Sequence, residues 1–383
     1  MKVLHIYRTY FPDPPGGLQE AIRQISLSTR ACGVDPRIFT LSPNPVPRDI
    51  WFPEGVVTRS RSWAAPASCD LGGFESLRQY RAQAEQADVL HFHFPWPFAD
   101  VLHLLGRVKK PAVMTYHSDV VRQRALGYVY GPLMRSTLRS MSAVVATSAV
   151  YAQSSAVLTS VVDPQRLKAI PLGIIDYRDD PQLGRFAPQC LDRLKLGTEP
   201  YVLALGVLRY YKGLHTLIEG APSIPCKIVI AGSGPEIERL SELAKQVGAS
   251  NVVFAGQVSH EEKVALLSGC RALVMPSHLR SEAFGMVLVE AEMFGKPVVC
   301  CEMGSGTSYV NEHGVTGFVV PPESPVEFAA AVNELVRDEA LAARMGVAAR
   351  ERYERLFSGP ALGNAYKALY QDVLNRTATS GKN

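Results

Sequence analysis

Short apolar runs alternate with amphipathic stretches along the first part of the chain. Runs of about 4–8 residues that are apolar throughout are typical of strands buried on both faces of a parallel sheet. Gln19–Thr29 and Gly131–Ser140 have apolar positions at helical spacing and predict helices between the strands. The predicted strands are Val3–Tyr7, Arg37–Leu41, Val89–Phe92, Ala112–Tyr116, Ala143–Thr147 and Leu167–Pro171.

The alternation lapses between Gly173 and Thr198 and then begins again. The lapse is rich in Pro, Asp and Arg, which is typical of a linker. The strands predicted beyond it are Tyr201–Gly206, Lys227–Ala231, Val252–Ala255, Ala272–Met275, Val298–Cys301 and Gly317–Val320. Strands that alternate with helices predict parallel sheets covered on both faces. The sequence therefore predicts an α/β protein of two parallel-sheet domains with a cleft between them.

The same pattern sets the expected boundaries. We expect the first domain at residues 1–175, a linker at 176–198 and the second domain at 199–358. Pro325–Phe357 and Pro360–Leu374 predict closing helices, and the helix at 359–376 is expected to pack back on the first domain. Residues 377–383 predict a disordered tail.

Length and composition agree with a two-domain globular protein. The chain has 383 residues, with 47% hydrophobic and 20% charged. No apolar run reaches the roughly 18–20 residues that span a bilayer, and Met1–Tyr7 predicts a first strand rather than a signal peptide. Seven cysteines without framework spacing, two of them adjacent at Cys300 and Cys301, indicate reduced structural thiols in the cytoplasm.

The net charge of +4 is mild but uneven. Two readings fit the basic cluster between residues 101 and 150: a solvated helical face, or a patch that faces anionic lipid headgroups. We expect no nucleic-acid binding, since no motif or interleaved aromatic pattern accompanies the charge. The cluster consists of Arg107, Lys109, Lys110, Arg122, Arg124, Arg135 and Arg139, against the single acid Asp119.

The segment from Ser277 to Glu290 carries the densest chemistry of the chain. It places Glu282 and Glu290 eight positions apart around the start of an apolar helix, with Gly285 between them. A helix N-terminus has unpaired N–H groups and about half a positive charge, which suits a phosphate. A carboxylate at each end of such a segment suits the hydroxyls of sugars. We therefore expect this segment to bind a nucleotide sugar.

Three glycine-containing segments follow predicted strands, at the sheet edge where ligands bind in open α/β folds. Gly16-Gly17 is either a turn or a close approach of the backbone to a ligand. Arg209 and Lys212, in the loop after Tyr201–Gly206, are either solvated cations or groups that neutralise a diphosphate. Gly232–Glu236 predicts a helix start, with phosphate or ribose proximity as its second reading.

His117 is the histidine for which a functional role is favoured. It ends a predicted strand and is followed by the small polar residues Ser118 and Asp119. His91 and His93 point the same way on one strand without further ligands, so packing or a substrate wall is favoured over metal binding. The sequence predicts no metal site.

Together, these residues resemble the retaining glycosyltransferases of family 4. That family has the GT-B fold, in which two Rossmann-like domains face each other across a cleft, and the resemblance covers nearly the whole chain. The segments 115–119, 209–215 and 276–285 are more narrowly similar to O-antigen mannosyltransferases, which resemble enzymes that add the first mannose or D-rhamnose to lipid-linked N-acetylglucosamine.

The resemblance implies a role for each site residue. Glu282 would contact the transferred sugar, Glu290 the ribose, and His117 would orient the sugar near the reacting carbon. Arg209 and Lys212 would stabilise the departing diphosphate. The implied catalytic residues are Glu282, His117, Arg209 and Lys212, and the implied donor-binding residues are Gly16, Gly17, Arg209, Lys212, Gly234, Val258, Lys263, Glu282, Ala283, Phe284, Gly285, Met286, Val287 and Glu290.

Two positions depart from the family pattern. Val207 stands where many members carry an arginine, so Arg209 would have to supply that charge. His260 stands where some guanine-binding relatives carry an aspartate. Lys263 is similar in placement to a lysine that reads guanine, and its other reading is an exposed helix lysine.

The implied activity is metal-independent transfer, with retention, of an α-mannosyl or D-rhamnosyl unit from a GDP-sugar. The acceptor would be a polyprenyl-diphosphate-linked N-acetylglucosamine, and the new linkage would be α-1,3, in O-antigen assembly. The enzyme would lie on the cytoplasmic face of the inner membrane, at its anionic surface. The first domain would bind this acceptor. The alternatives are use of a UDP-sugar or another acceptor, a nucleotide-sugar epimerase, and a non-catalytic nucleotide-sugar-binding protein.

Overall fold

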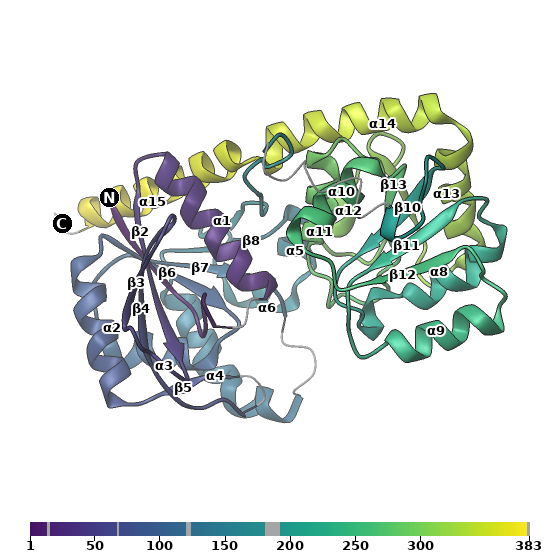
Figure 1. Ribbon diagram of the computed structural model, residues 1–383. Helices are drawn as coiled ribbons and strands as arrows, with labels where there is room; N and C mark the ends of the chain where they lie inside the picture. Colours follow the sequence, from purple (N-terminus) through teal and green to yellow (C-terminus); the bar gives the residue numbers. More distant parts are fainter. Residues whose placement is uncertain (14–15, 67–68, 120–123, 181–191, 381–383) are drawn as a thin grey trace. The chain divides into compact units, whose positions relative to one another are not determined.

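The computed structural model describes residues 1–13, 16–66, 69–119, 124–180 and 192–380 (Figure 1). The chain forms two compact units. The first comprises residues 1–175 together with 359–383, and the second comprises residues 176–358. Among the described residues, no helix is both long enough and apolar enough to cross a membrane. Six cysteines are free thiols, and Cys190 lies outside the described residues.

The first unit is built on one sheet whose strands run in the order β3-β4-β2-β1-β6-β7-β8-β9, with β5 paired to β4. The pairs from β4 through β9 are parallel, whereas β3 and β5 run antiparallel to β4. The strands are β1 (Lys2–Ile6), β2 (Asp35–Ser42), β3 (Asp49–Phe52), β4 (Gly55–Ala64), β5 (Leu71–Gly72), β6 (Val89–Phe94), β7 (Ala112–Tyr116), β8 (Ala143–Ala146) and β9 (Leu167–Ala169).

Strands β3, β4 and β5 are absent from the sequence-based prediction, which expected a parallel sheet alone. The reason lies in β4, whose buried residues include the polar Thr58, Arg59 and Ser60. Each of these side chains forms a hydrogen bond inside the unit. Arg59, for example, donates to Ser42 Oγ at 2.7 Å. A strand of this kind has no apolar run to reveal it.

Helices flank this sheet, as the alternation predicts (Figure 1). They are α1 (Gly17–Ala31), α2 (Phe74–Gln86), α3 (Pro97–Gly106), α4 (Arg124–Ser140), α5 (Ala149–Ser154), α6 (Ala156–Val161) and α15 (Gly359–Ser380). Helix α15 packs on α1, and a Cβ at Gly363 would lie 2.3 Å from the carbonyl oxygen of Ser28. The helix continues to Ser380, so residues 377–380 are helical and the predicted disordered tail is wrong for them.

The second unit contains a six-stranded sheet that is parallel throughout, in the order β12-β11-β10-β13-β14-β15. This is the strand order of a Rossmann sheet, and the order reverses between β10 and β13. The strands are β10 (Tyr201–Leu205), β11 (Lys227–Ala231), β12 (Val252–Gly256), β13 (Ala272–Met275), β14 (Val298–Cys301) and β15 (Gly317–Val320).

The helices of this unit include a short 3-10 turn, η3 (Tyr210–Lys212), directly after β10. The α-helices are α8 (Leu214–Gly220), α9 (Ile237–Gln246), α10 (His260–Gly269), α11 (Met286–Met293), α12 (Thr307–Val310), α13 (Pro325–Arg337) and α14 (Glu339–Arg352). A second 3-10 turn, η4 (Ala221–Ser223), follows α8, and a π-helical turn, η5 (Tyr353–Phe357), follows α14.

The expected linker at 176–198 belongs to the second unit where the structure describes it. Leu194 and Leu196 are buried, and Arg193 donates to Glu262 Oε1 at 2.7 Å. These contacts make 192–196 part of the packed unit rather than a free connection. The remaining part of the expected linker, 181–191, lies outside the described residues.

Four histidines lie in the core of the first unit: His5, His91, His93 and His117. Burial lowers the pKa of His5 and of His117 to about 3. The pKa values of His91 and His93 also fall well below their usual 6.5, because burial disfavours the charged ring. All four rings are therefore neutral at physiological pH.

We expect the free energy of unfolding to fall as the pH drops below about 6.5, the pKa of an unfolded histidine. Below that pH the histidines of the unfolded chain bind protons. The buried rings of the folded protein stay neutral until the pH reaches their much lower pKa values. Each histidine then costs about 1.4 kcal/mol per pH unit. Urea unfolding over a series of pH values measures the slope. His5→Phe should reduce this slope, whereas the control His313→Gln, at an exposed histidine, should leave it unchanged. Equal slopes in the parent protein and His5→Phe would contradict a buried, neutral His5.

Candidate functional site

The second unit carries a pocket where the strand order reverses. Ligands bind at this point in open α/β sheets, because the connections after the two strands diverge to opposite faces. The loops after β10 and β13 form its rim. Its lining residues are Ala204, Leu205, Gly206, Val207, Leu208, Lys212, Leu214, Ile230, Val274, Met275 and Pro276.

Two glycines allow the loops around this pocket to pack backbone against backbone. Gly213 has a φ of 63°, and a Cβ there would lie 2.0 Å from the carbonyl oxygen of Pro276. Gly232 has a φ of 134°, and a Cβ there would lie 2.0 Å from the carbonyl oxygen of Gly206. Only glycine fits at either position. The loops after β10, β11 and β13 are thereby fixed against one another.

Lys212 and Glu282 form an ion pair at the pocket. Lys212 ends η3 after β10, and Glu282 lies in the loop between β13 and α11. Burial opposes the charge on Lys212, but the neighbouring carboxylate outweighs it and raises the pKa of the ammonium. The two predicted residues are therefore brought together, and the pair favours the charged form of Lys212.

The N-terminus of α11 follows immediately. Gly285 is its N-cap in a left-handed conformation, with φ 85° and ψ 64°, and no side chain caps the helix. Phe284 is buried, whereas Ala283, Met286 and Val287 are half-buried. A helix start without a side-chain cap leaves N–H groups for an external acceptor. The helix start that the sequence predicts is thus present at residues 285–287, and no side chain caps it.

Glu290 lies one turn along α11 and is held by two side chains. Lys263 Nζ lies 2.5 Å from Glu290 Oε1, and Tyr177 Oη donates to the same oxygen at 2.8 Å. The ammonium of Lys263 also lies over the Tyr177 ring, 5.4 Å from its centroid. The reading of Lys263 as an exposed helix lysine is wrong, because it is half-buried and paired.

Tyr177 is the site residue that sequence reasoning missed. It lies in the expected linker, where its neighbours are Asp and Arg, and its ring packs 4.9 Å from that of His260. A single aromatic residue in a polar linker is the one signal that could have singled it out.

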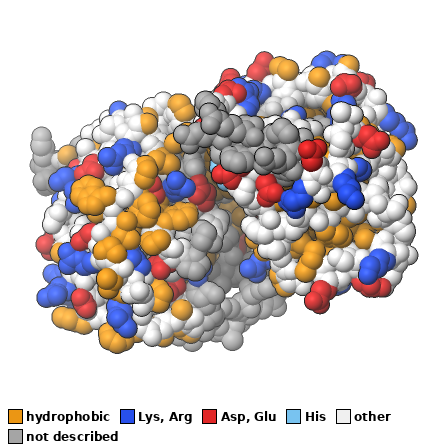
Figure 2. All heavy atoms as spheres, in the orientation of Figure 1, with side chains coloured by type: hydrophobic (Ala, Val, Ile, Leu, Met, Phe, Trp, Pro, Cys, Tyr) orange, Lys and Arg blue, Asp and Glu red, His pale blue; other side chains and the backbone are white. Residues whose placement is uncertain are grey.

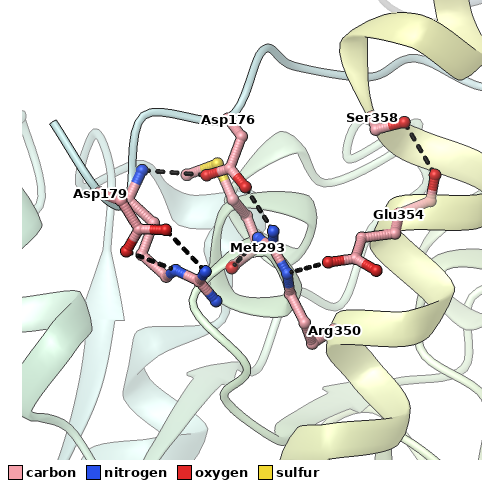
Figure 3. Close-up of polar contacts among 7 residues, drawn as sticks. Asp176, Asp179, Met293, Arg350, Glu354 and Ser358 are labelled. Atoms are coloured by element: carbon pink, nitrogen blue, oxygen red, sulfur yellow. Dashed lines mark hydrogen bonds and ion pairs between the residues drawn. The ribbon is translucent and has the colours of Figure 1, made fainter.

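A polar network fixes the segment that carries Tyr177 (Figure 3). Arg350 on α14 donates to Asp176 Oδ2 at 2.5 Å, to Glu354 Oε1 at 2.7 Å and to the carbonyl oxygen of Met293 at 2.6 Å. Asp176 Oδ1 in turn accepts from the backbone N–H of Arg178 at 3.0 Å. Tyr177 lies between these two anchored residues, so the network sets the position from which it reaches Glu290.

The structure gives three other predicted donor-binding residues no side-chain pairing of this kind among the described residues. Arg209 is exposed and has no side-chain bond or ion pair to the described residues. Gly234 has a packing reason to be glycine, because a Cβ there would lie 2.4 Å from the carbonyl oxygen of Leu208. Val258 is half-buried just before the capping box of α10, which Ser259 and Glu262 form.

The first unit carries the remaining predicted residues. Gly16 is the N-cap of α1, and a Cβ at Gly17 would meet no atom within 4 Å. Glycine at position 17 therefore has no internal steric cause. His117 follows β7, is 5% exposed and shares a hydrogen bond of 3.0 Å between its Nε2 and Nδ1 of His93.

One group of possible metal ligands occurs among the described residues: His5, His91 and His93, with candidate ligand atoms within 4.8 Å of one another. Both ring nitrogens of His91 are already hydrogen-bonded, Nδ1 to Tyr370 Oη and Nε2 to Thr115 Oγ1, each at 2.7 Å. The group therefore fits a hydrogen-bonded core better than a metal centre.

The two units match two protein families. Residues 16–173 match a family described as glycosyl transferase 4-like domain, and residues 192–352 match glycosyl transferases group 1. The chain is 42% identical over 360 residues to D-rhamnosyltransferase WbpZ of Pseudomonas aeruginosa, covering 94% of this chain and 92% of that protein. It is 36% identical to O-antigen chain mannosyltransferase C of Escherichia coli, covering 98% and 99% of the two chains.

Solved structures show the same fold. Sucrose-phosphate synthase from Thermosynechococcus elongatus has a TM-score of 0.78 at 23% identity, covering 98% of this chain and 99% of that one. WaaG, a glycosyltransferase involved in lipopolysaccharide biosynthesis, has a TM-score of 0.65 at 19% identity, covering 94% and 97%. The solved structures show the GT-B fold, and the two family matches and the two relatives place the chain among the group 1 and family 4-like glycosyltransferases.

Proposed function

We propose that the protein transfers an α-mannosyl or D-rhamnosyl unit from a GDP-sugar to polyprenyl-diphosphate-linked N-acetylglucosamine, with an α-1,3 linkage, in O-antigen assembly. The observation that carries the proposal is the order of groups along one edge of the second unit: Lys212 paired with Glu282, the uncapped start of α11, and Glu290 held by Lys263 and Tyr177. The names of the two relatives support the sugar and the pathway.

The carboxylate of Glu290 suits the ribose. Its Oε1 accepts from Lys263 and Tyr177, whereas Oε2 bonds to none of the described residues and is available to ribose hydroxyls. Because Lys263 directs its ammonium at Glu290, the geometry favours a positioning role for this lysine over reading the guanine base. Val258 and the Tyr177–His260 pair remain as groups to border the base.

The diphosphate would bind the N–H groups at the start of α11 and the cations Lys212 and Arg209. These positive groups stabilise the charge that develops on the leaving GDP, and they take the place that a divalent metal has in other phosphate sites. Arg209 is exposed and unpaired within the described part of the chain, so its side chain is free to reach the phosphates in place of an arginine at Val207. The backbone at Gly17 would approach the diphosphate closely.

The remaining groups would act on the sugar. Glu282 would accept hydrogen bonds from its hydroxyls, while the ion pair with Lys212 holds the carboxylate in place. His117 is neutral, since burial lowers its pKa to about 3, which favours a hydrogen-bonding role over general base catalysis. Retention would follow from attack on the face that the leaving group departs from, with a phosphate oxygen of GDP taking the acceptor proton. A covalent intermediate on Glu282 is the alternative.

The acceptor would bind the first unit, with the membrane surface close by. At the end of α3, Leu104 and Leu105 are 56% and 52% exposed, beside the exposed cations Arg107 and Lys109. Arg135 and Arg139 on α4 are also exposed. The cluster members Arg122 and the Arg124 side chain lie outside the described residues. Hydrophobic, basic and acidic side chains are interspersed on the face of this unit that Figure 2 shows. The exposed leucines and cations at the end of α3 and on α4 suit an anionic lipid surface.

Glu282→Ala should lower kcat by about 100-fold, the scale of losing one group that stabilises a transition state, and leave the Kd for GDP nearly unchanged. Glu290→Gln should instead weaken GDP binding, by about tenfold for one charged hydrogen bond. Titration calorimetry with GDP and initial rates separate the two effects. Glu327→Gln, at an exposed position of the same unit, is the matched control. Full activity of Glu282→Ala would remove Glu282 from the mechanism.

A panel of GDP- and UDP-sugars with the lipid-linked acceptor tests the reaction itself. We expect transfer from GDP-mannose or GDP-D-rhamnose, an α-configured product, and the same rate in excess EDTA, because cations of the protein supply the positive charge. Turnover with UDP-sugars alone would overturn the donor assignment. Conversion of the donor without acceptor would indicate an epimerase, and tight donor binding without any turnover would indicate a binding protein.

Flotation with vesicles of anionic phospholipid tests the membrane surface. We expect binding at low salt that high salt reverses, since each basic residue near such a surface contributes about 1 kcal/mol. Charge reversal at Lys109 and Lys110 together should lower the bound fraction by tenfold or more on that scale. Arg344→Glu, on α14 of the second unit, should not. No binding at low salt would count against the surface.

A further inference from the structure

Three buried histidines form one hydrogen-bonded chain across neighbouring strands of the first sheet. His5 Nδ1 lies 3.0 Å from His93 Nε2, and His93 Nδ1 lies 3.0 Å from His117 Nε2. The three come from β1, β6 and the end of β7, which are adjacent in the sheet. Their rings are nearly parallel, with interplanar angles of 21° and 25°. The chain leads from the core to the histidine that the proposed function places at the sugar.

The protonation of these rings is coupled. Each ring is neutral because it is buried, and a neutral imidazole has one N–H donor and one acceptor nitrogen. His93 uses both nitrogens in the chain, so it donates to one neighbour and accepts from the other. Whichever nitrogen of His93 carries the proton, the same nitrogen must carry it in His5 and His117. The three tautomers change together or not at all.

The inner end of the chain selects between the two arrangements. His5 Nε2 is buried and has no hydrogen-bond partner. If it carried a proton, the core would contain an orphaned N–H, which is rarer in proteins than an acceptor without a partner. The proton of His5 is therefore on Nδ1, and by the coupling His93 and His117 are protonated on Nδ1 as well. Because Nε2 of His117 accepts from His93, its Nδ1–H is the group left to donate outward.

We propose that His93 and His5 are positioning residues that lock His117 in the neutral Nδ1–H tautomer, as a fixed hydrogen-bond donor to an oxygen of the transferred sugar. The sugar contact rests on the proposed function, whereas the lock does not. His91, on the same strand as His93, takes no part in the chain, because its two nitrogens bond to Tyr370 and Thr115.

The lock can be read without turnover by NMR of the full chain labelled with ¹⁵N in its histidine rings. Two-bond correlations identify which nitrogen of each ring carries the proton. We expect His5, His93 and His117 to be protonated on Nδ1. In His93→Phe, which keeps a ring of similar size but removes both hydrogen bonds, His117 should lose its single tautomer. A parent enzyme with mixed or unlike tautomers in the three rings, or an unchanged His117 in His93→Phe, would overturn the proposal.

Kinetics then separates positioning from folding. We expect kcat of His93→Phe to fall by about tenfold, the scale of one hydrogen bond, with the Kd for GDP unchanged because GDP would bind the second unit. His103→Phe, in the same unit but outside the histidine chain, should change neither.

If His93→Phe does not fold, His5→Phe tests the same lock from its inner end and should release the tautomers of His93 and His117. A shift of these resonances on adding Zn²⁺ to the parent would indicate a metal site and overturn the lock. Absence of transfer with every donor would overturn the proposed function. It would not affect the test of the tautomer lock, because the NMR measurement does not depend on turnover.

Discussion

The site of the second unit depends on one close contact of backbone with backbone. Gly213 lies against the carbonyl of Pro276 with no room for a Cβ, which joins the loop after β10 to the loop after β13. These are the two strands between which the sheet order reverses. Lys212 precedes the contact and Glu282 follows it in the chain, so the same contact that closes the loops also brings opposite charges together. The charged pair near the pocket is then held by the fold as well as by its own attraction, since both side chains are largely shielded from solvent.

Glu290 shows a different means of positioning. Its two partners come from different parts of the chain: Lys263 from α10 and Tyr177 from the segment before β10. Arg350 then fastens the Tyr177 segment to α14 and to the end of α11. A residue that contacts no ligand in the proposed mechanism thus sets the geometry of one that does.

The sequence was sufficient where structure follows from local pattern. The strands of the second unit were predicted to within a residue because each is a short apolar run, and those inside the sheet are buried on both faces. The likeness of Glu282, Glu290 and Lys212 to a family motif singled out three residues that the structure places on neighbouring segments of the second unit. The polar strand β4, the partner Tyr177 and the linkage of His5, His93 and His117 were missed. Each depends on pairings between residues far apart in the chain, which neither periodicity nor a local motif encodes.

Helix α15 sets the point in synthesis at which the first unit can be completed. The sequence of the second unit lies wholly between the two parts of the first. Tyr366 and Tyr370, whose hydroxyls bond to Thr115 and His91 in the core, are made only after the second unit has been synthesised. During synthesis, the first sheet therefore lacks the cover of α15, and Thr115 and His91 lack these tyrosine partners. This lasts until the whole second unit has emerged from the ribosome. The unit that begins first is the last to be completed.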